Sequence, residues 1–196
     1  MNILIVFENF INWIDYNYFF ALFLFFLFIF FAALFSIPGW IPYLVFAGYA
    51  FGVFFPFIVC MLAFLIGSLF FFVISKYFLS KFFKKYYMNI ANKINYFIKD
   101  SSIEYLIIFR IIPATPLLFQ NIIISLLDIS IYKFIFVAFI SATPIFLFCI
   151  LLGNKINNLV SIANISIKDI FTLDLFFIIF VIVIIMTIRI IYKKRI

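Results

Sequence analysis

The sequence predicts an all-α integral membrane protein with about four transmembrane helices and two re-entrant helical hairpins that form an inverted repeat. The first observation behind this prediction is composition: 69% of the 196 residues are hydrophobic and 11% are charged, whereas a soluble domain carries about 25% charged residues. The second is that residues 16–75 contain no Asp, Glu, Lys or Arg. The third is that prolines and glycines interrupt two of the apolar stretches, so that neither can be one straight helix.

Composition also excludes several kinds of site. The chain has no His, and its two cysteines, Cys60 and Cys149, lie inside apolar runs, so we expect no metal site, no disulfide framework and no cofactor. The basic residues behind the net charge of +7 flank the apolar runs. This placement indicates contact with membrane lipids and the anionic headgroups of the inner leaflet, and it argues against nucleic acid as a partner.

The N-terminal segment and first span are predicted at residues 1–35, the span itself at about 18–36. Acidic residues precede it where a signal peptide would be basic, so we interpret the span as retained. Residues 37–56 are then broken by proline and glycine but wholly apolar. Broken backbone at membrane depth must be covered by protein or line a cavity. We therefore expect a first re-entrant hairpin and then a span at 57–75, the hairpin being shaped by Pro38, Gly39, Pro42, Gly48 and Gly52.

Residues 77–100 interleave lysines with apolar residues at a helical period. This pattern predicts an amphipathic helix that lies on the anionic cytoplasmic leaflet. A connector packed on the protein's own base is an equal alternative.

A second re-entrant hairpin is predicted at about 102–131. Ser101 and Glu104 have the spacing of a capping box, so a helix begins there. It meets Pro113 after about eleven residues, or 16 Å, which is half a bilayer. Spans at 134–152, with Pro144 inside, and at 175–188 follow. The last span belongs to a C-terminal segment, 156–196, that ends in a basic tail.

The distribution of Lys and Arg favours hairpins over kinked spans. If both broken segments return to the side they entered and both termini are cytoplasmic, eleven basic residues lie inside and two outside, with Arg110 left at membrane depth. If both segments cross, the basic stretch 76–99 and the basic tail fall on opposite faces. The positive-inside bias supports the first arrangement. The hairpins then enter from opposite sides, as in an inverted repeat, and residues 37–42 and 112–116 carry a weak echo of each other around their prolines.

The second hairpin resembles a known family. The run Phe109-Arg110-Ile-Ile-Pro113-Ala-Thr-Pro116, followed by Asn121, is similar to the R-x-x-P-x-x-P-x-x-x-x-N signature of the DedA superfamily, in its SNARE-associated Golgi protein (VTT-domain) branch. Ile37-Pro38-Gly39, residues 47–52 and Gly67 resemble the first half of that domain, and Pro144 and Gly153 fall where the family often has Pro and Gly. The resemblance covers about residues 36–155.

The resemblance implies two re-entrant hairpins in an inverted repeat and movement of lipids between leaflets, either phospholipids or polyprenyl-phosphate carriers. The sequence departs from the better-known bacterial transporters of the superfamily in two ways. It has no acidic residue in the first hairpin, and it has Pro116 where they tend to carry a second Arg. Proton-driven transport through the first hairpin is therefore not expected, and Glu104 and Asp128 are the titratable candidates in the second.

Four residues are candidates for contact with lipid: Arg110, Gln120, Asn121 and Asp128. A cation at bilayer depth costs roughly 3 kcal/mol or more, so Arg110 is paired or functional. Its guanidinium can hold a phosphate bidentately, and the alternatives are an ion pair with Asp128 or snorkelling to the cytoplasmic face. Gln120 and Asn121 either satisfy broken backbone or line a polar path. Pro113 and Pro116 shape the hairpin.

The leading hypothesis is thus a lipid-translocating protein of a bacterial-type plasma membrane. The alternative is a membrane-embedded trafficking or assembly factor without transport activity, which would recruit partners through helix 77–100. An enzyme is not expected, because the sequence shows no paired acids within one span and no Ser-His or Cys-His constellation. A homo-oligomer is compatible with the sequence.

Overall fold

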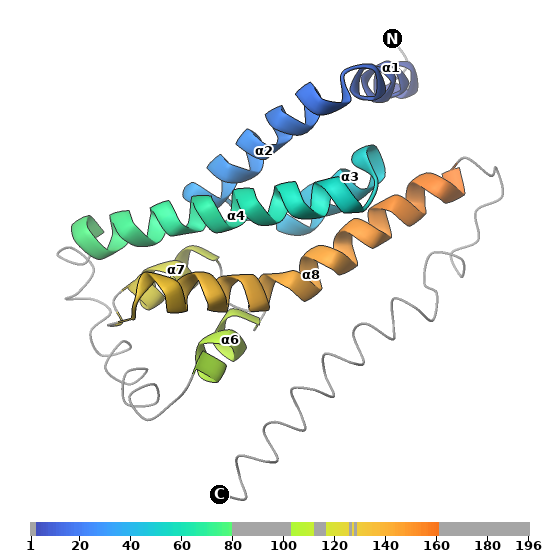
Figure 1. The fold of residues 1–196 in the computed structure, drawn as a ribbon. Coiled ribbons are helices and arrows are strands. Elements are labelled where there is room, and N and C mark those ends of the chain that lie inside the picture. The colour runs from blue at the N-terminus through green and yellow to red at the C-terminus, as the bar shows by residue number, and fades with distance from the viewer. Residues whose placement is uncertain (1–2, 80–102, 112–116, 126, 128, 161–196) are drawn as a thin grey trace, which may run out of the picture.

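The computed structural model describes residues 3–79, 103–111, 117–125, 127 and 129–160. Every element in this part of the chain is helical, which confirms the all-α prediction for it (Figure 1). Most of the helix predicted at 77–100 lies outside the described residues, as do Pro113, Pro116, Asp128, the side chain of Glu104 and the last predicted span. The elements are α1 (Ile3–Tyr16), α2 (Tyr18–Leu34), α3 (Trp40–Phe51), α4 (Phe54–Ile74), the π-helical turn η1 (Ser75–Leu79), α6 (Ile103–Ile111), α7 (Leu117–Ser125) and α8 (Ile131–Val160).

Two of these helices are long and apolar enough to cross a membrane. They are α4 with the start of η1, at a mean hydropathy of 2.9, and α8, at 2.7. They match the spans predicted at 57–75 and 134–152 and extend beyond both. A third candidate exists if α1 and α2, which meet at an angle of 106°, count as one broken span. Large apolar side chains are exposed along the outer faces of α2, α4 and α8, as expected of surfaces that face lipid.

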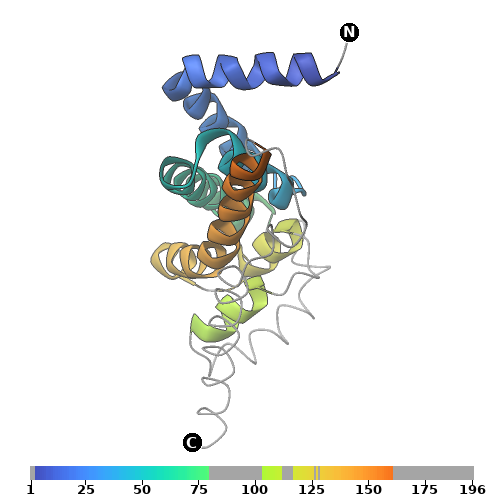
Figure 2. The same ribbon diagram turned by 90° about the vertical axis from the view of Figure 1, so that its right-hand side faces the viewer.

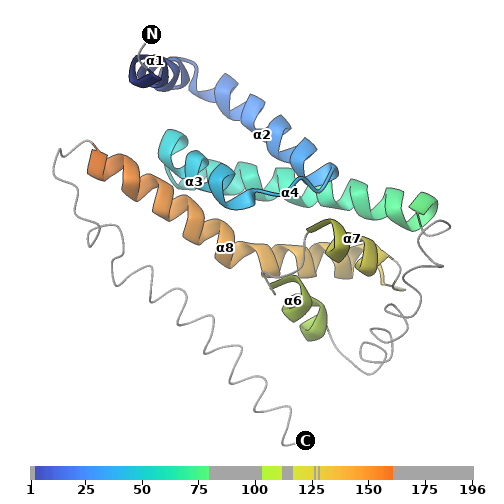
Figure 3. The same cartoon turned by 180° about the vertical axis from the view of Figure 1, so that it is seen from behind.

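The helices pack as two interlocked halves. The long helices α4 and α8 lie side by side and run in opposite directions (Figure 1). In the first half, α2 packs on α4, whereas α3 packs on α8. In the second half, α6 packs on α8, whereas α7 packs on α4 (Figure 3). In each half, therefore, the first helix packs on the long helix of its own half and the second packs on the long helix of the other half.

Helices α2 and α3 form an antiparallel pair joined by a turn at residues 35–39. The Tyr18 hydroxyl donates to the Phe51 carbonyl oxygen at 2.9 Å, and ring contacts join Phe25 to Phe46 and Phe28 to Tyr43. Gly39 caps α3 with a backbone φ of +110°, which favours glycine.

The C-terminal end of α2 has a defined place against α4. The C-terminal end of α2 meets the middle of α4, where Gly67 contacts the backbone of Phe30 and Leu34, and α4 with η1 continues to Leu79. Thus α2 stops well short of the far end of α4. The structure thus pairs α2 with α3, whereas the sequence predicted a span at 18–36 and then a hairpin at 37–56. The apolar run of α2 is long enough for a span, but its length does not reveal where along α4 it ends.

Close approach of helix backbones explains two of the glycines. A Cβ on Gly48 of α3 would overlap the Ile150 carbonyl oxygen of α8, and one on Gly153 of α8 would overlap the Val45 carbonyl oxygen of α3. Small residues allow such contact between membrane helices. Gly52 makes no contact of this kind, because nothing lies within 4 Å of an added Cβ. Gly52 instead forms the turn before α4, with φ +82°.

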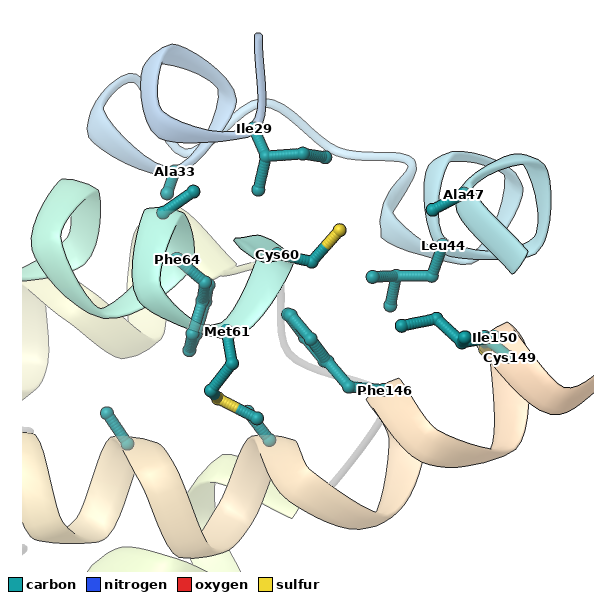
Figure 4. Close-up of a cluster of buried hydrophobic side chains, with 13 residues drawn as sticks. Ile29, Ala33, Leu44, Ala47, Cys60, Met61, Phe64, Phe146, Cys149 and Ile150 are labelled. Atoms are coloured by element: carbon teal, nitrogen blue, oxygen red, sulfur yellow. The ribbon is translucent and has the colours of Figure 1, made fainter. Parts of the chain in front are cut away.

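The main apolar core lies where α2 and α3 meet both long helices (Figure 4). It combines residues of α2, α3, α4 and α8, among them Ile29, Ala33, Leu44, Ala47, Cys60, Met61, Phe64, Phe146, Cys149 and Ile150. Both cysteines are free and buried here, where they pack as small apolar residues.

Candidate functional site

A chain of three polar side chains joins the tips of the two helix pairs. Arg110 lies in the last turn of α6, Asn121 in the middle of α7, and Ser36 in the turn between α2 and α3. Arg110 Nη2 donates to Asn121 Oδ1 at 3.0 Å, and Asn121 Nδ2 donates to Ser36 Oγ at 3.2 Å. All three residues are buried, Asn121 completely. These hydrogen bonds therefore couple the second half of the protein to the first.

The Arg110 guanidinium has only part of its hydrogen-bonding capacity occupied. Its Cζ lies 4.7 Å from the centroid of the Phe134 ring, which gives a cation–π contact. Its Nε is buried and has no hydrogen-bond partner. A buried donor without a partner is costly, so an acceptor that reached Nε would be bound favourably. Among the described side chains Arg110 has no ion pair, and the predicted pair with Asp128 stays a prediction because Asp128 is outside them.

Gln120 satisfies broken backbone, which is one of the two roles predicted for it. Its Nε2 lies 3.5 Å from the Phe109 carbonyl oxygen and 3.4 Å from that of Arg110. These are among the last carbonyls of α6, which have no partner within their own helix. Gln120 thus ties the end of α6 to α7 and helps to hold Arg110 in place.

A second cation lies on the same aromatic pair, a feature that the sequence analysis missed. Phe134 stacks on Phe72 with ring centroids 4.3 Å apart, and Lys76 Nζ lies 5.8 Å from the Phe72 centroid. Lys76 also donates to the Ile129 carbonyl oxygen at 3.4 Å. Arg110, Phe134, Phe72 and Lys76 thus lie in a row, which we call the ladder, with a cation at each end and two rings between them. The ladder runs from the end of α6 to η1.

Ser36 was also missed, although the sequence holds a trace of it. It lies two residues before Pro38, and it has a positive backbone φ of +52°, uncommon for a residue other than glycine. Strained backbone of this kind often accompanies a functional contact, here the hydrogen bond from Asn121.

Three of the predicted hairpin-shaping residues, Pro38, Gly39 and Pro42, lie in the turn before α3 or in its first turn. Gly39 is the N-cap of α3, and Pro42 lies in its first turn, where a missing N–H costs no helical hydrogen bond. Pro38 lies in the turn before them, and Pro144 lies inside α8. Among the described residues no group of three or more His, Cys, Asp or Glu could hold a metal ion. The site offers positive charge and hydrogen-bond donors, which suit an anion.

Comparison with known families gives one match. The family model of the VTT domain matches residues 37–155, which is more than half of the chain. The matched region includes α3, α4, α6, α7 and most of α8. Comparisons with curated proteins and with solved structures found no match.

Proposed function

Because the chain belongs to the family of proteins with a VTT domain, which is the domain of the DedA and SNARE-associated Golgi proteins, we propose that it moves phosphate-bearing lipids between the leaflets of a membrane. The observation that carries the proposal is the buried Arg110, held at the meeting point of the two helix pairs with one donor bonded to Asn121 and Nε unpartnered.

The lengths of the short helices suit paired re-entrant hairpins. Helix α3 has 12 residues, and α6 and α7 have nine each, which gives lengths of about 18 Å and 14 Å. The hydrocarbon core is about 30 Å thick, so none of these helices can cross it alone. In our proposal α2–α3 and α6–α7 enter from opposite faces and meet near the midplane, while α4 and α8 cross.

The meeting point lowers the barrier for a headgroup. An isolated phosphate in hydrocarbon would lose its hydration without compensation. Arg110 can bind a phosphate through two parallel N–H donors, Nε, which has no hydrogen-bond partner, and Nη2. The phosphate would displace Asn121 from Nη2, and acyl chains would stay in lipid along the exposed apolar faces. Both phospholipids and polyprenyl phosphates present this chemistry, and we propose a bacterial-type plasma membrane as the location.

Reconstitution in liposomes tests the proposal. Phospholipid carrying a quenchable fluorophore in both leaflets would be exposed to a membrane-impermeant quencher, so that the second leaflet is quenched only as lipid flips. The parent protein should accelerate this phase. Replacing Arg110 by Ala should slow it about tenfold or more, since a hydrogen bond to a charged group contributes about 1.5–3 kcal/mol. Arg110→Lys should restore little, because Lys lacks the planar fork.

Lys133→Ala is the matched control, because Lys133 is an exposed cation at the start of α8. Its rate should equal that of the parent. A parent protein that accelerates neither phospholipid nor a labelled polyprenyl phosphate would refute the proposal, and so would full activity of a folded Arg110→Ala variant. Activity on only one of the two lipids would identify the substrate class.

The trafficking or assembly alternative relied on helix 77–100, most of which lies outside the described residues, and no described contact favours it. A variant that lacks residues 80–100 and still transports lipid would separate the two functions.

A further inference from the structure

Helix α1 has two chemically different sides. Glu8, Asn12 and Asp15 recur at the spacing of one helix face. The opposite side carries apolar residues, of which Ile14 is buried, and the Phe7 and Phe10 rings contact Tyr49 and Phe46 of α3, at centroid distances of 5.9 Å and 6.3 Å.

The apolar side of α1 is only partly covered by protein. Phe7, Phe10 and Trp13 remain between 41% and 48% exposed. The exposed parts of these three large apolar side chains favour an apolar medium, whereas the carboxylates on the opposite face favour water. Helix α1 therefore suits a place that is apolar on one side and aqueous on the other. The boundary between headgroups and acyl chains provides such a medium.

The direction of α1 supports the same conclusion. It lies at 106° to α2, and α2 packs on α4, a candidate span. Figure 2 shows α1 lying across one end of the molecule. Figure 1 views α1 end-on while α4 and α8 run across the picture, so α1 crosses the direction of these two helices and lies close to the plane of a membrane that they cross. Helix α1 also carries Trp13 and Tyr16, which is 92% exposed. Tryptophan and tyrosine are enriched at the interface between membrane and water.

Contacts of α2 identify the end of the molecule at which α1 lies. Tyr18 is bonded to Phe51, which directly precedes the turn into α4, so α1 lies at the N-terminal end of α4. At the C-terminal end of α4, η1 carries Lys76, which is the first Lys or Arg in the chain and the start of the basic stretch 76–99. Because basic segments are retained in the cytoplasm, α1 lies on the other face.

We propose that α1 binds the headgroup layer of the non-cytoplasmic leaflet and that the N-terminus lies on that face. This replaces the cytoplasmic N-terminus expected from the sequence. The charge count is unaffected, because residues 1–75 contain no Lys or Arg and moving residues 1–17 leaves eleven basic residues inside and two outside. The inference depends on α4 crossing the membrane and is independent of lipid transport.

Labelling of single cysteines in intact cells tests the side. Asn12→Cys lies on the exposed polar face of α1, and Lys133→Cys lies exposed at the opposite end, at the start of α8. Both would be made in a background with Cys60 and Cys149 replaced by Ala. A membrane-impermeant maleimide should label Asn12→Cys equally in intact and lysed cells, and Lys133→Cys only after lysis. Labelling of Asn12→Cys only after lysis, or of both sites in intact cells, would overturn the proposal.

Fluorescence quenching tests the depth. With Trp40 replaced by Phe, Trp13 is the only tryptophan. In liposomes, lipid brominated near the top of the acyl chain should quench Trp13 more strongly than lipid brominated near the chain end. Equal quenching, stronger quenching by the deep bromine, or no quenching would show that α1 does not lie at the interface. None of these outcomes bears on the flip-flop assay, so the two proposals can fail separately.

Discussion

Replacing Gly153 by Ala tests the backbone contact between α3 and α8. The new Cβ would overlap the Val45 carbonyl oxygen and lie 2.8 Å from both the Val45 carbonyl carbon and the Tyr49 amide nitrogen. Ordinary contact begins at 3.4 Å, so α3 must retreat by at least 0.6 Å, the difference between these distances. No rotamer change can relieve the clash, since the opposing atoms are backbone.

The expected cost follows from two opposing terms. Overpacking a filled core costs about 1–3 kcal/mol, and a clash with backbone lies at the upper end of that range. Ala in a helix interior is about 1 kcal/mol more favourable than Gly. The net effect is a loss of about 2 kcal/mol, or about 30-fold in the folding equilibrium. If α3 and α8 were farther apart, the second term would act alone and Gly153→Ala would stabilise the protein.

The assay is unfolding in mixed micelles, with the SDS fraction as denaturant and circular dichroism as the signal. Asn157→Ala is the matched control, because Asn157 lies one turn farther along α8 and is exposed. It should leave stability unchanged or raise it by at most about 0.7 kcal/mol. A Gly153→Ala protein as stable as the control, or more stable, would refute the described contact.

Three further predictions concern the polar chain and the ladder. Asn121→Ala should lower the free energy of unfolding by about 1.5 kcal/mol, since it removes the charge-assisted bond to Arg110 and the bond to Ser36. A double-mutant cycle with Ser36→Ala, measured by SDS unfolding, should show that the two effects are coupled. Additive effects would mean that the two halves are not linked at this point. Ser36→Gly should be less destabilising than Ser36→Ala, because Gly relieves the strain of φ +52°, and equal stability of the two variants in the same assay would show that the strain is absent. Phe134→Leu should slow lipid flip-flop less than Arg110→Ala but more than Lys76→Gln. The reason is that Phe134 contacts Arg110 directly, whereas Lys76 is separated from Arg110 by two rings. A flip-flop rate in liposomes that is lower for Lys76→Gln than for Phe134→Leu would contradict this order.

Much of the site was predictable because rare polar residues stand out against an apolar background. Arg110, Gln120 and Asn121 were identified in this way, and the structure brings them together. Phe72 and Phe134 could not be singled out in the same way, because the chain has 35 Phe and each carries little information. Lys76 appeared only as the end of a span, since its contact with Phe72 depends on how α4 meets the start of α8.

The fold was predictable where hydropathy and helix length agree. Helices α4 and α8 are long and apolar and match predicted spans, and the break at Pro38-Gly39 is a turn. The path of α2 was not predictable from its own residues, because Gly67 decides where its end packs and belongs to another helix. Helix α1 left a signal in the spacing of Glu8, Asn12 and Asp15, but the choice between a solvated and an interfacial helix depends on the rings of α3.

The exchange of short helices between the halves has a consequence for assembly. A half made alone, with α2, α3 and α4 only, would leave the α3 face that meets α8 without a partner, and its own α4 would lack the cover that α7 provides. Neither face could be buried within one copy. Two copies inserted in opposite orientations could each supply the missing helix to the other. An isolated half would therefore bury both faces only as a two-fold dimer, in which each copy supplies the helix that the other lacks.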